Sequence, residues 1–147
     1  MSEDTKQTGS PYVVGIDLGT TNCAIAYIDA ELEEGDEGYG TVETLEIPQL
    51  VRAGTIKEQP LLPSFLYVPG EHEVAEGASE LPFETTEGTI LGVFARDQGA
   101  KVPHRLVSSS KSWLCHGGVN RRGAILPWES DPEDVAKISP LDAQTRI

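Results

Sequence analysis

The chain has 147 residues and a formal net charge of -13 at pH 7, which argues against general binding to nucleic acids and against docking on anionic membranes. With 38% hydrophobic and 24% charged residues, its composition fits a globular segment that is long enough to bury a core. The sequence has no apolar run of membrane-spanning length, and its polar start, MSEDTKQTGSP, lacks the apolar core of a signal peptide, so we expect a cytoplasmic protein. Two cysteines, Cys23 and Cys115, are too few for a disulfide framework.

The first predicted element is a β-hairpin. It follows a polar lead-in, residues 1–10, which has no hydrophobic periodicity and which we expect to be disordered. Two apolar, β-branched runs, residues 12–18 and 23–28, flank the small polar tip Gly19-Thr20-Thr21-Asn22. The carboxylate of Asp17 stands at the mouth of this tip.

The polar tip has the composition of a phosphate-binding turn. Its glycine lets the backbone turn sharply and present N–H groups to an anion, and the two threonines add hydroxyl groups beside them. An acid next to such a turn suits Mg²⁺, which takes oxygen ligands and keeps several waters. From these residues alone, the alternative is an ordinary sheet corner in which Asp17 caps the turn.

The middle of the chain alternates acidic loops with short strands. Residues 30–40 combine many acids with glycines, which predicts a solvated loop, and their spacing does not match a calcium-binding EF-hand. Residues 41–51 predict a strand in which Pro48 marks a bulge or an edge. Residues 62–68, LPSFLYV, predict a second strand. The acidic residues 71–87 predict an irregular segment, and residues 88–94 predict a short apolar strand.

A helix is predicted over residues 103–116, PHRLVSSSKSWLCH, because a proline opens it, apolar residues share one face and two glycines follow it. Lys111 borders the apolar face of this predicted helix. By its spacing alone, Lys111 reads as a solvated surface residue. The neighbouring pair Cys115 and His116 has no further ligands at zinc-like spacing.

The last part of the chain predicts two more elements. Residues 124–128 read as a strand, and the basic pair Arg121-Arg122 before them reads as a solvated turn. A helix is expected to begin near the end of the chain, with Ser139 as its N-cap and Pro140 at its first position.

Three segments resemble one known family. The string VGIDLGTTN, residues 14–22, resembles the first phosphate motif of the actin-like ATPase superfamily, in particular that of the seventy-kilodalton heat-shock (DnaK-type) chaperones. Residues 62–64, LPS, are similar to the Thr-Pro-Ser strand of that family except at Leu62. Residues 110–114, SKSWL, fall where those chaperones have an Ile-Lys-Arg-Leu-Ile type helix, but Ser112 replaces the arginine and Trp113 an aliphatic residue.

The resemblance implies a site for ATP or ADP with Mg²⁺. In that family the hairpin holds the phosphates of the nucleotide, which assigns phosphate contacts to the tip residues Gly19, Thr20, Thr21 and Asn22. It places Asp17 in the magnesium shell as a metal-side catalytic residue. It also implies that Lys111 is catalytic, reaching the terminal phosphate and the attacking water.

The resemblance further implies a mixed α/β fold, namely the N-terminal part of an actin-like (ribonuclease H-like) ATPase domain, β-rich with one to three helices. Residues 11–147 then cover only the opening part of the first lobe and stop before the second lobe. Because phosphoryl transfer needs several groups at once, the segment alone is expected to show no ATP hydrolysis. Turnover that is lost in Asp17→Asn would overturn that expectation. Unfolded polypeptide clients and co-chaperones are expected to bind parts outside these residues, and neither nucleic acid nor membrane is an expected partner.

Three other functions remain open at this point. A sugar kinase of the same superfold also opens with an Asp-x-Gly-Thr-Thr hairpin, although the LPSF strand and the helix with Lys111 favour the chaperone pattern. An actin-like filament subunit would form polymers that depend on nucleotide, which sedimentation with and without ATP would reveal. A small acidic β-rich interaction module would bind no nucleotide at all.

Overall fold

The computed structural model describes residues 10–75, 77–79, 81 and 88–147. Nine strands, three α-helices and one 3-10 helix are assigned within this part of the chain. In chain order they are β1 (Tyr12–Leu18), β2 (Asn22–Asp29), β3 (Glu43–Thr44), β4 (Ile47–Arg52), β5 (Thr55–Gln59), β6 (Leu62–Pro63), β7 (Phe65–Tyr67), β8 (Ile90–Leu91), α1 (Gly92–Gly99), the 3-10 helix η1 (Pro103–Arg105), β9 (Leu106–Ser108), α2 (Ser110–Cys115) and α3 (Pro140–Arg146). The fold class is therefore mixed α/β, as predicted, with mostly short elements.

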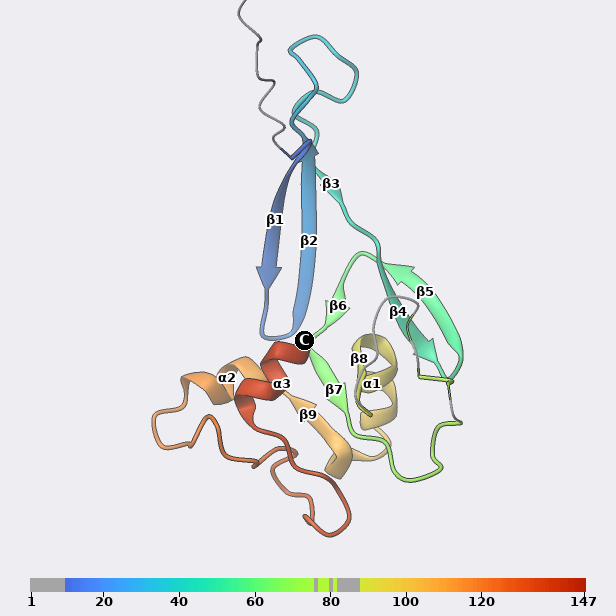
Figure 1. Ribbon diagram of the computed structural model, residues 1–147, viewed down its shortest axis with the longest axis vertical. Helices are drawn as coiled ribbons and strands as arrows, with labels where there is room; N and C mark the ends of the chain where they lie inside the picture. The colour runs from blue at the N-terminus through green and yellow to red at the C-terminus, as the bar shows by residue number, and fades with distance from the viewer. Residues whose placement is uncertain (1–9, 76, 80, 82–87) are drawn as a thin grey trace, which may run out of the picture.

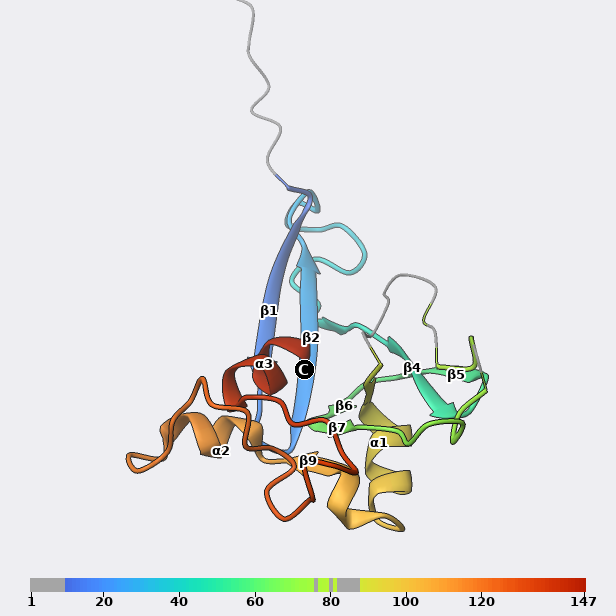
Figure 2. The same ribbon diagram turned by 60° about the horizontal axis from the view of Figure 1, so that its bottom comes forward.

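The strands form three small antiparallel sheets. In the first, β2 lies in the centre: β1 pairs with one of its edges, and β3 and β6 pair with the other. The second sheet contains β4 and β5, and the third has the order β8-β7-β9. Figure 1 shows the β1–β2 hairpin projecting from the body of the molecule, with its turn directed toward α2 and α3, and Figure 2 shows the same arrangement from a second direction.

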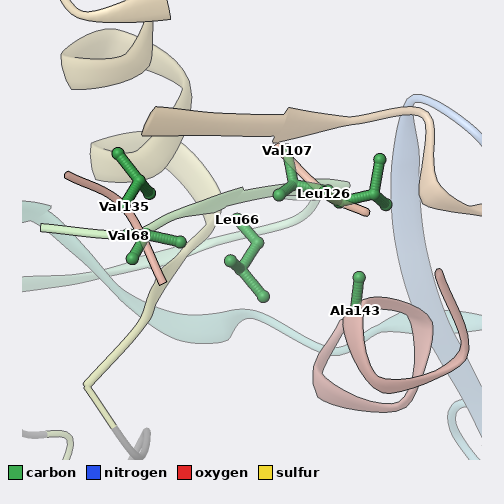
Figure 3. Packing of buried hydrophobic residues seen from close by; sticks show 6 residues of the cluster. All are labelled: Leu66, Val68, Val107, Leu126, Val135 and Ala143. Carbon is green, nitrogen blue, oxygen red and sulfur yellow. The ribbon is translucent and has the colours of Figure 1, made fainter. Parts of the chain in front are cut away.

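The hydrophobic core lies beneath the turn of the hairpin, in two clusters. The larger one gathers buried aliphatic side chains from β7, β9, α3 and the segment between α2 and α3: Leu66, Val68, Val107, Leu126, Val135 and Ala143 (Figure 3). The second cluster joins Leu50 of β4, Tyr67 of β7, Ile90 of β8 and Ala95 of α1. Strand β7 contributes to both clusters and so ties the body together.

Several predicted elements are confirmed. The hairpin forms as expected, although its second strand begins one residue early, at Asn22. The predicted strand over residues 62–68 forms as β6 and β7, with a break at Ser64. Helix α3 begins as predicted: the hydroxyl of Ser139 accepts a hydrogen bond from the backbone N–H of Asp142 (3.0 Å), and Pro140 occupies the first turn. Of the predicted disordered lead-in, residues 1–9 lie outside the described residues.

The predicted helix over residues 103–116 is wrong. Only Ser110–Cys115 is α-helical, and the preceding residues form η1 and the strand β9. Leu106 and Val107, whose spacing suggested a helical face, instead pair with Tyr67 and Leu66 of β7. The chain then turns through Ser109, whose φ of 54° lies in the left-handed region and interrupts any continuous helix.

Three strand predictions need correction. Residues 88–94 form a strand only at Ile90–Leu91, and the rest of the apolar run opens α1. Residues 41–51 divide into β3 and β4, and a register shift follows Leu50 in the two-stranded sheet that contains Pro48. Residues 124–128 make a single bridge, from Leu126 to Ile138, rather than a strand.

The hairpin exposes apolar side chains on both faces, as in Val13 (57% exposed) and Ile16 (63% exposed). One face lines an open groove of about 500 Å³ with Tyr12, Val14, Ile16, Ile25, Tyr27 and Leu45. Within the described residues, the outer edge of β1 pairs with no strand. A strand with apolar residues on both faces and a free edge is typical of a position inside a larger sheet.

A hydrogen-bond cluster around Glu73, at the surface of the body, predicts acid sensitivity. Burial alone would raise the pKa of Glu73, but hydrogen bonds from the backbone N–H of Gly70, the hydroxyl of Tyr67 and the amide of Gln98, together with the charge of Arg105, outweigh it and lower the pKa. Because the folded-state pKa lies below the unfolded value, this stabilisation is complete above the unfolded pKa and is lost as the pH falls through the folded one.

We therefore expect Glu73→Gln to reduce the fall in Tm that the chain shows on acidification from neutral pH to below the ordinary glutamate range. Thermal unfolding followed by circular dichroism over that pH series measures the difference. The control is Glu71→Gln, since Glu71 is highly exposed and, within the described residues, forms an ion pair only with the exposed His72. If Tm falls equally with pH in the unsubstituted chain and in Glu73→Gln, the role of Glu73 in acid sensitivity is contradicted.

Candidate phosphate-binding site

The tip of the hairpin is a tight turn that requires glycine. Strands β1 and β2 pair from Tyr12 opposite Asp29 to Leu18 opposite Cys23, which leaves residues 19–21 to reverse the chain. A Cβ atom at position 19 would lie 2.2 Å from the carbonyl oxygen of Asn22, a distance that no real contact allows. The sequence predicted a sharp backbone turn at Gly19, and the turn geometry agrees with it.

Three of the four predicted tip residues lie together in the turn, and the fourth belongs to the sheet. Thr20 and Thr21 are exposed and Gly19 is half-buried. Within the described residues, no backbone carbonyl or side chain accepts a hydrogen bond from the N–H of Thr20 or Thr21. Asn22 is half-buried as the first residue of β2 and lies opposite Pro63 of β6. The turn thus offers two exposed N–H groups and two exposed hydroxyls on consecutive residues.

Lys111 reaches this turn from a distant part of the sequence. Its ammonium group donates a hydrogen bond to the carbonyl oxygen of Leu18, at 2.6 Å and across 93 positions of sequence. Helix α2, which carries Lys111, is held in place because β9 pairs with β7 and because the hydroxyl of Ser110 donates to the side chain of Gln144 on α3 (2.8 Å). The structure therefore brings the predicted lysine to the end of the predicted hairpin.

Lys111 remains free to exchange partners. Its side chain is exposed, and its hydrogen bond to Leu18 is also exposed to solvent. An ammonium group in water gains little from a single exposed acceptor, so an incoming phosphate can displace the carbonyl at small cost. The placement of Lys111 suits a group that binds an anion beside the turn.

Asp17 is the residue before Leu18 on β1, and it pairs with Ala24 of β2. The side chains of Asp17 and Ala24 therefore lie on one face of the hairpin, and those of Ile16 and Leu18 lie on the other face. The residue is exposed, and no ion pair within the described part of the chain joins it to Lys111.

The described residues contain no group of three or more His, Cys, Asp or Glu side chains able to hold a metal ion. A single carboxylate fits Mg²⁺ only where phosphate oxygens and water supply the other ligands, which is the usual binding mode of that ion beside nucleotides. Asp17 therefore fits a magnesium ion that arrives with a polyphosphate, and the chain provides no dedicated metal cage among the residues described.

Ser64 is a site residue to which the sequence assigned no role. It lies in the break between β6 and β7, is 3% exposed, and donates two hydrogen bonds to the hairpin turn. One signal was present in the sequence: Ser64 is the single small polar side chain within the apolar strand LPSFLYV. A buried hydroxyl in such a strand needs a partner, and here the partner is a backbone carbonyl of the hairpin turn.

Other candidate groups lie apart from the turn. Cys23 is buried in β2 whereas Cys115 is exposed at the end of α2, and both are free thiols. Arg121 and Arg122 occupy an exposed turn, as the sequence predicted. In the portion of the chain that is described, every helix lacks the length and apolar character needed to cross a membrane.

Comparison with known proteins gives no further guide to function. No family model, no curated protein and no solved structure matches this chain.

Proposed function

We propose that the hairpin turn and Lys111 form the phosphate-binding wall of an ATPase of the actin-like type, and that the chain is the ATP-binding segment of a heat-shock-70-like chaperone. One observation carries the proposal: Lys111 lies at the end of the hairpin, 2.6 Å from the Leu18 carbonyl oxygen, although 93 positions separate the two residues. Lysine beside a turn with exposed N–H groups is a combination that favours phosphate.

Each side chain has a distinct part in this proposal. The exposed N–H groups and hydroxyls of Thr20 and Thr21 hold phosphate oxygens, and Lys111 neutralises charge on the terminal phosphate. Asp17 would hold Mg²⁺ through its bound waters, and the ion would supply charge neutralisation when bound. The exposed apolar face of the hairpin supports its place within a larger lobe, and the chain by itself is expected to bind nucleotide without turning it over.

Titration of the chain with MgATP, MgADP, inorganic pyrophosphate and AMP, followed by calorimetry or by the amide signals of residues 19–21, tests the proposal. We expect the di- and triphosphates and pyrophosphate to bind, and AMP to bind much more weakly, because the turn recognises phosphates beyond the first. Failure of every polyphosphate to bind would overturn the proposal. Polymers that form only with nucleotide would favour a filament subunit over a chaperone.

The substitution Asp17→Asn is expected to abolish the dependence of ATP affinity on Mg²⁺. The affinity of the variant for MgATP should fall to the value that the unsubstituted chain shows in EDTA, because the neutral amide no longer attracts the cation or orders its waters.

The matched control is Asp29→Asn. It removes the same charge at the other end of the same hairpin, and an asparagine oxygen can still accept the hydrogen bond that Asp29 receives from the N–H of Glu31 (2.8 Å). Equal losses of Mg²⁺ dependence in both variants would show that the overall charge of the hairpin, and not a magnesium site at Asp17, is responsible.

A further inference from the structure

Ser64 connects the body of the molecule to the hairpin turn through two hydrogen bonds. Its hydroxyl donates to the carbonyl oxygen of Gly19 (2.8 Å), and its backbone N–H donates to the carbonyl oxygen of Thr21 (2.8 Å). The same hydroxyl lies 3.5 Å from the sulfur of Cys23 at the start of β2. A single buried residue, 45 positions from Gly19 in the sequence, thus holds two of the carbonyl groups of the turn.

The orientation of a carbonyl fixes the orientation of the next N–H group. In a trans peptide the C=O of one residue and the N–H of the following residue point in opposite directions within one plane. The one cis bond in the described residues joins Leu126 and Pro127, well outside the turn. Because Ser64 binds the carbonyl of Gly19, the N–H of Thr20 must point away from Ser64.

The turn therefore has a held side and an open side. Ser64 occupies the held side, and the N–H of Thr20, directed to the open side, meets no acceptor within the described residues. Thr20 and Thr21 are exposed, so water or an anion has access to their N–H groups. Without the Ser64 hydroxyl, the peptide unit between Gly19 and Thr20 could rotate, and its N–H would lose its fixed direction.

We infer that Ser64 is the positioning residue of the phosphate site: it fixes the peptide unit between Gly19 and Thr20 so that the Thr20 N–H is directed toward a phosphate oxygen. Ser64 does not touch the ligand in this arrangement. Preorganised N–H groups bind anions more tightly than mobile ones, because the cost of ordering them is met on folding. The inference rests on the proposed function and adds to it the residue that gives the turn its direction.

The chain itself provides a matched control. Ser130 is also buried, at 8% exposure, and its hydroxyl donates to the carbonyl oxygen of Pro127 (2.9 Å), in a segment that does not form the turn. Ser64→Ala and Ser130→Ala each remove one buried hydroxyl-to-carbonyl hydrogen bond. Both are expected to lower Tm, so stability alone does not distinguish them, whereas pyrophosphate binding does.

The experiment titrates inorganic pyrophosphate with Mg²⁺ into the full chain while the amide signals of residues 19–22 are recorded. We expect Ser64→Ala to raise the dissociation constant by about three- to tenfold, the effect of one lost hydrogen bond. Ser130→Ala should leave it unchanged, and Ser64→Thr, which keeps a hydroxyl, should retain most of the affinity. In the absence of pyrophosphate, Ser64→Ala should also shift and broaden the Thr20 amide signal.

Each outcome decides a separate question. Unchanged binding and an unchanged Thr20 signal in Ser64→Ala, or an equal loss of binding in Ser130→Ala, would overturn the role of Ser64. If Ser64→Ala does not fold, hydrogen exchange in the unsubstituted chain decides: the Ser64 N–H should be protected and the Thr20 N–H should exchange freely, and the reverse would overturn the inference. Failure of the unsubstituted chain to bind pyrophosphate would overturn the proposed function, and with it the ligand assigned to the turn.

Discussion

The substitution Gly19→Ala is expected to abolish polyphosphate binding and to destabilise the chain by about 1–3 kcal/mol, the usual cost of forcing an extra methyl group into a packed position. The added Cβ would lie 2.2 Å from the carbonyl oxygen of Asn22. The Asn22 oxygen is a backbone atom, and the added Cβ is bonded directly to the backbone of the same turn. No flexible side chain can therefore move aside to relieve the contact. The turn must open, and the N–H group of Thr20 then loses its fixed direction.

Calorimetric titration with MgATP and thermal unfolding measure the two effects of Gly19→Ala, and Gly15→Ala provides the control within the same hairpin. A Cβ at position 15 would lie 3.9 Å from the carbonyl oxygen of Ala26, which is an ordinary contact. Gly15→Ala should therefore change stability by no more than about 0.5 kcal/mol and leave nucleotide affinity unchanged. Retention of full MgATP affinity in Gly19→Ala would show that the turn is not the phosphate site.

The sequence predicted correctly those elements that are determined by residues within or directly beside the element. The hairpin follows from two apolar runs around a small polar turn, and helix α3 follows from Ser139 and Pro140 at its start. In both cases the residues that stabilise the element are its own neighbours. Propensity and pattern therefore agree with the tertiary structure.

Prediction failed where a distant strand or side chain determines the conformation. Leu106 and Val107 have helical spacing, but they form the strand β9, because they pair with Tyr67 and Leu66 along the edge of β7. Similarly, the apolar run after Gly88 continues as helix α1, and Gln49 of β4 accepts a hydrogen bond from the N–H of Val93 (3.0 Å) in the first turn of that helix. Gln49 lies 44 positions earlier in the chain, so no local pattern reveals it.

The candidate site divides in the same way. The turn residues and Asp17 became candidates from the sequence because their chemistry is contiguous in sequence. Spacing alone assigned Lys111 to the solvent, and only its resemblance to a family motif suggested a role. The folded chain brings it to Leu18 because β9 and α3 fix the position of α2. Ser64 was missed because its two partners, both carbonyl groups of the turn, are backbone atoms and leave no trace in side-chain patterns.

The substitution Lys111→Ala is expected to separate nucleotide binding from hydrolysis. In a form of the protein that turns over ATP, the rate should fall by about 100- to 1,000-fold, the typical effect of removing one group that stabilises transition-state charge. The affinity for MgATP should fall by less than about tenfold, because the turn and Mg²⁺ supply most ground-state contacts. In the proposed function the reason is electrostatic: negative charge shifts along the terminal phosphate during transfer, and the ammonium group beside Leu18 would stabilise that charge.

Single-turnover rates and equilibrium titrations of the same Lys111→Ala preparation measure the two effects, with Lys101→Ala as the control. Lys101 follows α1 and carries the same charge, and its ammonium group contacts only the side chain of Gln98 (3.4 Å) among the hydrogen bonds of the described residues. Lys101→Ala changes the net charge by the same amount as Lys111→Ala and should affect neither the hydrolysis rate nor the affinity for MgATP. If Lys111→Ala reduces affinity and rate by the same factor, the lysine contributes to binding alone, because an interaction made only in the transition state leaves affinity largely intact.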